Sequence, residues 1–354
     1  MDRLKSSAYI ECLKTVINTN LPWDKLHDKT VLVTGASGLI GTFLCDVLMQ
    51  LNDSIKLNCK VIAIGRSREK LNKRFNAYTD NQIFISISQD VTKTICDELQ
   101  NCPVDYIFHL ASNTHPVSYA TQPISTIVTN VNGTNNLLSY AVEHGTKRFV
   151  FASSVEVYGE NRGDADFFDE KYCGYIDSNT LRAGYPESKR VCESLCQSYI
   201  SEKKLDVVIP RLSRVYGPTM LLSDTKALSQ FIKNAIEQKD IILKSEGNQF
   251  YSYIYVADAV SALFYCLFFG SCGEAYNIAD KNSNIKLRDL AAICADISDT
   301  KVLFEKPNDI EKAGFSKATK AVLNAAKLEE LGWSANWNLQ KGLENTISIM
   351  RDEL

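Results

Sequence analysis

Residues 31–41 read VLVTGASGLIG, an apolar run with strand character that leads directly into a glycine-rich turn. In a strand–turn–helix unit, Gly35 permits a tight turn, Gly38 lets the backbone approach a pyrophosphate, and Gly41 allows the helix to pack closely. The free N–H groups at the start of the helix then face the anion. The segment therefore predicts a dinucleotide-binding loop. The other residues assigned to this loop are Ser37, Leu39 and Ile40.

Outside this loop, short apolar runs alternate with stretches of helical periodicity. The further strand-like runs are KVIAIG (60–65), IFISIS (83–88), VDYIFHLAS (104–112) and RFVFASS (148–154). Helical stretches separate them, and this alternation is typical of βαβ units. The sequence therefore predicts an α/β fold: a doubly wound parallel sheet of the Rossmann type with helices on both faces.

The pattern also divides the chain. Residues 1–28 are predicted to form an N-terminal helical extension, and residues 29–218 together with 251–280 the NAD(P)-binding Rossmann domain. Residues 219–250 and 281–354 contain few buried-strand patterns. They are expected to form a smaller, mainly helical substrate-binding lobe over the carboxyl ends of the strands, where open α/β sheets bind ligands.

Composition narrows the function classes. The 354 residues are 45% hydrophobic and 23% charged, which excludes a disordered or fibrous chain. A net charge of −3 gives no general attraction for nucleic acid or an anionic membrane. No apolar stretch reaches the ~20 residues of a membrane span, and the N-terminus lacks a signal-peptide pattern, so a cytoplasmic protein is expected. The eleven cysteines show no CxxC spacing and are expected to be reduced, without a metal site.

The end of the second strand bears on the choice of cofactor. An acidic residue there would bind a free ribose 2′-hydroxyl, whereas this chain has Gly65-Arg66. A guanidinium suits a 2′-phosphate, so NADP is slightly favoured over NAD, although Arg66 can equally be a solvated loop cation. Asp90 and Val91 follow the third strand. Asp90 either accepts a hydrogen bond from the adenine amino group or caps the next helix.

A second motif, YPESK at 185–189, lies where a polar segment gives way to a helix. Tyr185 and Lys189 are four residues apart and so share a helical face. An ammonium group beneath the phenol would lower the phenol's pKa toward the working range. Such a phenol can exchange a proton with a substrate hydroxyl while hydride passes to nicotinamide. The motif alone occurs by chance, but its place after a fifth parallel strand favours function.

Several segments together resemble the extended short-chain dehydrogenase/reductase family, most closely its NAD(P)-dependent nucleotide-sugar epimerases, dehydratases and decarboxylases. They are TGASGLIG (34–41), HLAS (109–112), NVNGTNNLL (130–138), FASSVEVYG (151–159), YPESK (185–189) and RVYGP (214–218). The resemblance implies a nucleotide-activated sugar or polyol as substrate and a homodimer. It also implies that Ser154, Tyr185 and Lys189 are catalytic, with Ser154 favoured over Ser153. By the same analogy Ala111 and Ser112 lie near the nicotinamide and its ribose.

Glu156 separates the possible reactions. It resembles the glutamate of nucleotide-sugar dehydratases and decarboxylases, which in the dehydratases removes the C5 proton. An ordinary solvent-facing glutamate is the alternative. Val155 stands where thymidine-linked dehydratases carry an aspartic acid for the departing hydroxyl, and valine cannot donate a proton.

A further departure from the family concerns charge. Relatives generally have an arginine at the position of Tyr251, where it binds the diphosphate or, in decarboxylases, the substrate carboxylate. A phenol lacks that charge. Arg214, Arg211 or Lys226 could supply it, or each could be a surface cation. Tyr251 itself could donate one hydrogen bond to a phosphate.

The sequence therefore favours an enzyme that transiently oxidises a sugar hydroxyl with bound NAD(P) and returns the hydride, with net epimerisation as the outcome. The alternative is a 4,6-dehydratase with Glu156 as the base. A decarboxylase is less favoured because of Tyr251. A non-catalytic NAD(P) sensor is disfavoured because such proteins tend to lose the tyrosine and lysine that this chain retains.

Overall fold

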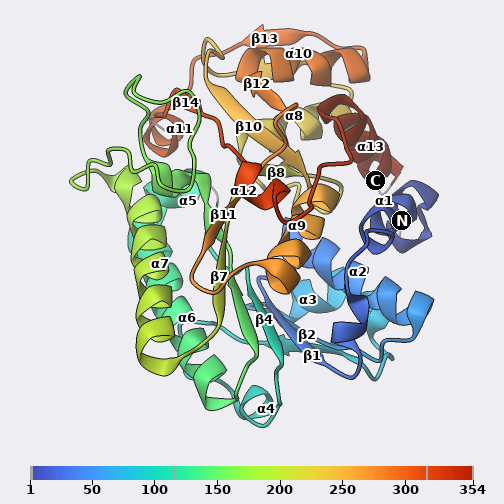
Figure 1. Ribbon diagram of the computed structural model, residues 1–354. Coiled ribbons are helices and arrows are strands. Elements are labelled where there is room, and N and C mark those ends of the chain that lie inside the picture. Colours follow the sequence, from blue (N-terminus) through green and yellow to red (C-terminus); the bar gives the residue numbers. More distant parts are fainter. Residues whose placement is uncertain (1–2, 115, 316–317, 353–354) are drawn as a thin grey trace.

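A parallel sheet forms the centre of the molecule (Figure 1). The computed structural model describes residues 3–114, 116–315 and 318–352. Within them the large sheet has eight strands in the order β11-β7-β5-β4-β1-β2-β3, with β6 beside β7. The strands are β1 (Thr30–Thr34), β2 (Lys60–Gly65), β3 (Phe84–Ser88), β4 (Tyr106–His109), β5 (Arg148–Phe151), β6 (Ser153–Ser154), β7 (Val207–Leu212) and β11 (Ala275–Ile278). This confirms the predicted Rossmann-type fold.

Helices cover both faces of the sheet, because successive strand residues point to opposite sides. On β1, Val31 and Val33 enter one buried cluster and Leu32 the other. The first cluster is covered by α1 (Ser7–Ile17), α2 (Leu39–Ile55), α3 (Arg68–Arg74) and α9 (Val256–Phe269). The second is covered by α4 (Asp97–Gln100), α6 (Pro123–Glu143) and α7 (Gly184–Lys203). The short helix α5 (Pro116–Thr121) precedes α6.

The N-terminal segment docks on α2 through a buried ion pair. The Arg3 guanidinium donates to both carboxylate oxygens of Asp46, at 2.7 and 2.9 Å. The hydroxyls of Tyr9 and Tyr78 donate to the same carboxylate. The buried charge is thus fully hydrogen-bonded, as burial requires.

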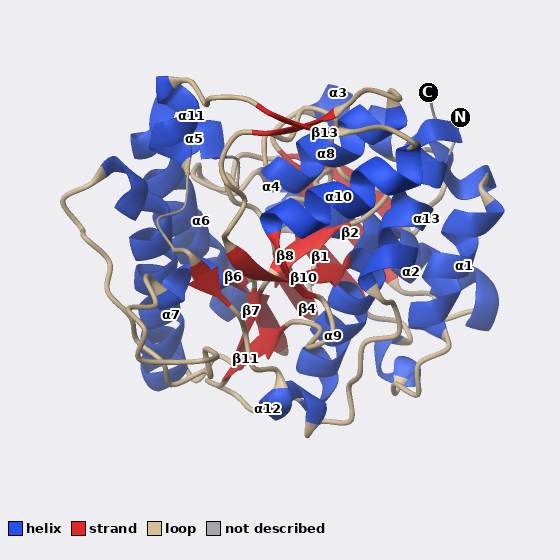
Figure 2. Cartoon of the chain, turned by 90° about the horizontal axis from the view of Figure 1, so that it is seen from above, coloured by secondary structure: helices blue, strands red, loops and turns tan. Residues whose placement is uncertain are grey.

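A second lobe lies beyond the carboxyl ends of the main strands (Figures 1 and 2). Its helices are α8 (Ala227–Ile236), α10 (Leu287–Ser298), α11 (Asp309–Gly314) and α13 (Leu339–Asp352), while α12 (Ala326–Glu329) packs beside β11 and α9. It also contains strands: β12 (Asn284–Lys286), β10 (Phe250–Tyr255) and β14 (Lys320–Ala321) form one sheet with β8 (Arg214–Tyr216), and β9 (Ile241–Leu243) pairs with β13 (Val302–Phe304). The lobe therefore contains more strand than the sequence indicated, because all of these strands except β10 are only two or three residues long and give no buried-strand pattern.

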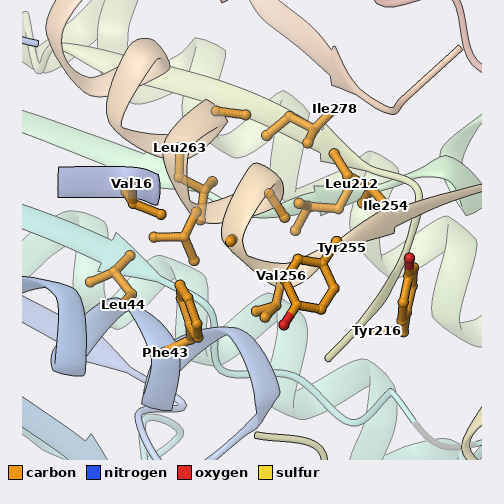
Figure 3. Close-up of a cluster of buried hydrophobic side chains, with 14 of the residues drawn as sticks. Val16, Phe43, Leu44, Leu212, Tyr216, Ile254, Tyr255, Val256, Leu263 and Ile278 are labelled. Atoms are coloured by element: carbon orange, nitrogen blue, oxygen red, sulfur yellow. The ribbon is translucent and has the colours of Figure 1, made fainter. Parts of the chain in front are cut away.

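Residues 251–280, expected to return as a unit to the main domain, are divided between the two lobes. Strand β10 pairs with β8, β12 and β14, whereas β11 extends the edge of the main sheet. Their buried side chains join one apolar cluster, in which Leu263 of α9, Tyr255 of β10 and Phe43 of α2 lie together (Figure 3). A continuous core therefore fixes the second lobe on the first.

None of the helices in the described residues combines the length and apolar character needed to cross a membrane. The eleven cysteines are all free thiols. Among the described residues, no group of three or more His, Cys, Asp or Glu side chains is arranged to hold a metal ion.

Candidate active site

The glycine loop connects β1 to α2 at the carboxyl edge of the sheet. Gly35 has a φ of +66°, and a Cβ there would lie 2.9 Å from the backbone nitrogen of Ala111. A Cβ on Gly41 would lie 2.5 Å from the carbonyl oxygen of Gly35. Gly38 is the N-cap of α2, and among the described residues no side chain caps that helix, so its first amides remain available to an anion. These features fit a dinucleotide pyrophosphate.

The rest of the expected loop is held by its neighbours. Thr219 donates a 2.7 Å hydrogen bond to the Leu39 carbonyl, which connects the loop to the start of the second lobe. A Cβ on Gly65 would lie 3.5 Å from the Ser37 hydroxyl oxygen. Ile40 packs partly buried against the main core.

Arg66 is exposed at the end of β2, and its Nη2 donates to the Asn113 side-chain oxygen at 3.4 Å. The Asn113 amide nitrogen is buried and has no hydrogen-bond partner among the described residues. Asp90 accepts hydrogen bonds from the backbone and hydroxyl of Thr92, at 2.9 and 2.8 Å. Burial opposes ionisation of Asp90, but these bonds and the charge of Arg66 outweigh it and lower the carboxyl pKa. Its second oxygen is the one left for an external donor.

A chain of hydrogen bonds links the loop after β4 to the helix of the YPESK motif. Ser112 donates to the Asn130 side-chain oxygen at 2.7 Å, and the Asn130 amide donates to the Ser188 hydroxyl at 2.8 Å. Asn130 therefore holds α6, α7 and the 110–114 loop in register. On the other side of α6, a Cβ on Gly133 would lie 2.7 Å from Val91, so this glycine allows the segment after β3 to pack on the helix.

Tyr185 lies in the first turn of α7, 6% exposed. Burial raises the pKa of its phenol to about 12, opposed by hydrogen bonding with Ser154. The charge of Glu156 also raises this pKa, while the charge of Arg182 and hydrogen bonding with Ser112 lower it. The phenol is therefore protonated at neutral pH in the free protein.

The Lys189 side chain reaches the end of β5. Its ammonium group donates to the carbonyl of Ala152 at 2.7 Å and lies 4.8 Å from the ring centre of Phe151. Burial lowers the pKa of Lys189 itself. Burial is the largest influence on the pKa of Tyr185 in the free protein, so an effect of Lys189 on the phenol stays a prediction.

The two candidate serines at the end of β6 face different partners. Ser154 caps the short helix η4 (Val155–Tyr158), accepting a 3.3 Å hydrogen bond from the Glu156 amide, and lies beside the Tyr185 phenol. Ser153 is buried and donates to Glu193 at 2.5 Å. The structure therefore brings Ser154, and not Ser153, to Tyr185.

Glu156 is bound to cations. Arg182, from the short helix η5 (Leu181–Ala183), donates to one carboxylate oxygen at 2.8 Å, and Arg214 lies 3.9 Å from the other. Arg182 Nε and Nη1 and Arg214 Nη1 are buried without a hydrogen-bond partner among the described residues. Two guanidinium groups face one carboxylate, so this group of three, called here the arginine cluster, has an excess positive charge. It is suited to one further anion.

The Arg214 guanidinium also stacks on Tyr251, 3.4 Å from the ring centre, because β8 and β10 are neighbours. The Tyr251 hydroxyl donates to the Ala318 carbonyl at 2.7 Å. This hydrogen bond holds the Tyr251 ring, against which the Arg214 guanidinium is stacked. Lys226 donates to Asp224 at 2.9 Å and to Thr114 at 3.3 Å.

Arg211, the third cation considered, is committed to a buried ion pair. Its guanidinium donates to both oxygens of Glu193, at 2.9 and 2.6 Å. Of the two candidate arginines, Arg214 is therefore the one with a buried guanidinium nitrogen that has no partner among the described residues.

A shallow, solvent-open cleft lies beside the arginine cluster. It is lined by Glu156, Arg182, Ala183 and Pro186, together with residues 159–160, 175–177, 180 and 318. The cleft thus lies at the start of α7, with Ala318 of the second lobe in its lining.

Sequence reasoning missed two side chains here. Arg182 stands three residues before Tyr185, a spacing that marks one helical face and could have drawn attention to it. Tyr119 of α5 stacks on Tyr185, with ring centres 4.8 Å apart and planes at 28°. No sequence signal identified Tyr119, because α5 is a single short turn.

Comparison with known proteins agrees with this geometry. A sequence model of the NAD dependent epimerase/dehydratase family matches residues 31–279. UDP-glucuronic acid decarboxylase 1 of Xenopus tropicalis is 30% identical over 329 residues, covering 92% of this chain and 73% of that protein. UDP-glucuronic acid decarboxylase 1 of Arabidopsis thaliana is 31% identical over 325 residues, with 92% and 70% coverage.

Solved structures share the fold. The UDP-glucose 4-epimerase of Thermotoga maritima, solved with UDP-glucose, superposes with a TM-score of 0.76 at 22% identity, covering 92% of this chain and 99% of that one. The UDP-glucuronic acid 4-epimerase of Bacillus cereus, solved with UDP-glucuronic acid and NAD, gives 0.77 at 23% identity, with 92% and 100% coverage. Sequence match and fold agree, and the chain belongs to the NAD-dependent epimerase/dehydratase family of enzymes.

Proposed function

We propose that this enzyme oxidises the C4 hydroxyl of a nucleotide-linked hexuronic acid and then releases the sugar's carboxylate as carbon dioxide. The observation that carries the proposal is the arginine cluster beside Tyr185, in which three buried guanidinium nitrogens have no hydrogen-bond partner among the described residues. The decarboxylase relatives support it, since they match 92% of the chain and are named for UDP-glucuronic acid.

In the proposed first step, Ser154 positions the C4 hydroxyl and Tyr185 takes its proton. A nicotinamide cofactor, held at the glycine loop and by Ala111 and Ser112, would accept the C4 hydride and later return it. Lys189 and the Ser112–Asn130–Ser188 chain hold the catalytic helix in place. The phenol's high pKa in the free protein means that substrate and cofactor must favour its ionisation.

The second step follows from the ketone. A C4 ketone makes the C6 carboxylate a β-keto acid, so the C5–C6 bond breaks and its electron pair passes to the C4 oxygen. Ser154 and Tyr185 hydrogen-bond that oxygen as it gains charge. C5 then takes a proton, and reduction at C4 completes the reaction. No acid for a leaving hydroxyl is needed, so Val155 is compatible with decarboxylation, whereas the dehydratase alternative would need Glu156 or water to act as acid as well as base.

Substrate binding is proposed to fall on residues of both lobes. Arg182 and Arg214 would bind the acidic part of the substrate, with Tyr251 as the platform of Arg214. Lys226 would join the loop at Thr114 to the lobe formed by 219–250 and 281–354. NADP is proposed to be preferred over NAD, since an arginine stands at the end of β2.

Net epimerisation, favoured from the sequence, remains the second candidate. It requires only Ser154, Tyr185, Lys189 and space for the ketone to turn. The absence of the family arginine at Tyr251 is the observation that favours it.

The test is incubation with UDP-glucuronic acid and NAD⁺ or NADP⁺, followed by proton NMR and by carbon dioxide measurement. A nucleotide-linked pentose with stoichiometric carbon dioxide is expected. A C4-epimeric uronic acid without carbon dioxide would establish epimerisation instead. Faster turnover of UDP-glucose than of the acid would refute the role of the arginine cluster.

We also propose a homodimer formed by α6 and α7, which pack side by side at one flank (Figure 1). Ile124, Ile127 and Val128 of α6 and Val191 of α7 are 78%, 41%, 38% and 47% exposed. An apolar surface of this kind favours association. Light scattering should show a dimer, and Ile124→Glu with Val191→Glu should give a monomer. A monomeric wild-type protein would contradict this.

A further inference from the structure

Tyr119 and the proposed catalytic phenol form a buried stack. Tyr119 comes from α5 and Tyr185 from α7, and each side chain is 6% exposed. Their ring centres are 4.8 Å apart with planes at 28°, so one face of the Tyr185 ring is covered by an aromatic ring rather than by water.

A charged side chain also contacts this pair of stacked rings. The Arg182 guanidinium lies 4.7 Å from the ring centre of Tyr119 while donating to Glu156. Arg182 and Glu156 act in opposite directions on the pKa of Tyr185. Tyr119 thus touches both the phenol and the cation that favours its ionised form.

The Tyr119 hydroxyl does not compete for the proton. Burial raises the pKa of Tyr119 well above its ordinary value, and the charge of Tyr185 acts the same way. Tyr119 is therefore neutral across the working pH range, and its contribution is to position and to exclude water. Its helix is held from both lobes, because α5 packs against α6 and α11.

We infer that Tyr119 is a positioning residue for Tyr185, which fixes the ring of the catalytic phenol and keeps water from it. This inference rests on the catalytic role proposed for Tyr185. Since burial is the largest cause of the raised phenol pKa, the ring of Tyr119 sets the pH at which Tyr185 ionises. Loss of the ring admits water and lets the phenol turn.

The variants are Tyr119→Leu, which removes the ring, and Tyr119→Phe, which keeps it. Tyr140→Leu is the matched control, since Tyr140 is also buried and stacks on the ring of His144, with ring centres 4.0 Å apart. Tyr140 lies near the C-terminal end of α6, the end remote from α5. If Tyr119→Leu does not fold, Tyr119→Met removes the ring with a flexible side chain of similar length.

The first readout needs no substrate: the pKa of Tyr185 from ¹³Cζ-tyrosine NMR, with the resonance assigned by its loss in Tyr185→Phe. Tyr119→Leu should lower this pKa by about 1 or more, while Tyr119→Phe and Tyr140→Leu leave it unchanged. An unchanged pKa in Tyr119→Leu would overturn the inference, even if the protein is destabilised.

The second readout is turnover. Tyr119→Leu should lower kcat about 10- to 100-fold at nearly constant KM and move the pH profile of kcat toward lower pH. Tyr119→Phe should stay within a few-fold of wild type, and an equal loss in that variant would overturn the inference. If wild type turns over no nucleotide-linked uronic acid, the proposed function fails, and the titration still decides the role of Tyr119.

Discussion

The proposed cofactor side of the site, around the glycine loop 35–41, and the proposed substrate side, at the arginine cluster, are built on different principles. At the cofactor side, main-chain atoms of the glycine loop and of α2 pack directly against each other. A Cβ on Gly41 would lie only 2.5 Å from the Gly35 carbonyl oxygen. At the substrate side, charged side chains from η4, η5 and β8 meet around Glu156. The backbone contacts at the glycine loop require glycines at fixed positions in one short segment, so they can be recognised from the sequence. The arginine cluster is assembled from three separate segments and has no such sequence pattern.

The largest effect is expected where the two sides meet. Tyr185→Phe removes the phenol's only ionisable group, so kcat should fall ~10²–10⁴-fold, as for a general acid–base group. Tyr140→Phe is the control, since it removes a buried hydroxyl that donates to the Leu99 and Cys102 carbonyls away from the site. Steady-state kinetics would measure both. Near wild-type turnover in Tyr185→Phe would exclude it as the proton acceptor.

The backbone character of the cofactor side is tested by Gly41→Ala. The added methyl group meets backbone atoms that cannot yield, and overpacking of this kind costs about 1–3 kcal/mol. Affinity for NAD(P)H, measured by fluorescence titration, should fall at least ~10-fold. Gly145→Asn is the control, because nothing lies within 4 Å of a Cβ there and asparagine tolerates its φ of +62°. Unchanged affinity in Gly41→Ala would show that the loop does not carry the cofactor.

Because the substrate side consists of side chains, its positive charge can be moved from one position to a neighbouring one by substitution. Arg214→Asn should raise KM for the nucleotide sugar about 10-fold, the cost of one charge-assisted hydrogen bond. Adding Tyr251→Arg should restore much of the loss, since the Arg214 guanidinium lies against that ring. Equal KM values for wild type and Arg214→Asn would show that this cation binds no substrate. Failure of the double variant to recover would show that the two strands do not present charge at one place.

The smallest effect is expected at the edge of the cofactor side. Arg66→Ala should reduce the preference for NADP over NAD about 3- to 10-fold, because an exposed cation beside a phosphate contributes modestly. Arg68→Ala, a neighbouring exposed cation on α3, should leave the preference unchanged. A wild-type protein that binds NAD more tightly would show that Arg66 is a surface charge only.

The fold around the glycine loop could be predicted well from the sequence because its determinants are local. The run VLVTGASGLIG specifies β1, the turn and the start of α2, and the structure contains all three. The parallel sheet follows from repeated βα units, each recognisable by period alone. The edge strand β11 could also be recognised, from its short apolar run.

The substrate side was less predictable for physical reasons. Glu156 stood out by its position, but its pairing with Arg182 and Arg214 depends on how η5 and β8 approach η4. Strand β10 pairs with β8, β12 and β14 rather than with the main sheet, which its sequence could not show because a buried strand has the same pattern in either sheet. The direction of the Lys189 ammonium depends on a backbone carbonyl, that of Ala152, which no side-chain pattern reveals.

In the proposed reaction, C4 of the nucleotide-linked sugar is oxidised and then reduced again within one active site. The direct measurement is turnover of UDP-glucuronic acid labelled with deuterium at C4, in ordinary water, with the product examined by NMR. The expected product is a nucleotide-linked pentose that retains deuterium at C4 and gains a solvent proton at C5, with one carbon dioxide released per product. Carbon dioxide release with loss of the C4 deuterium, or an unchanged uronic acid, would contradict it.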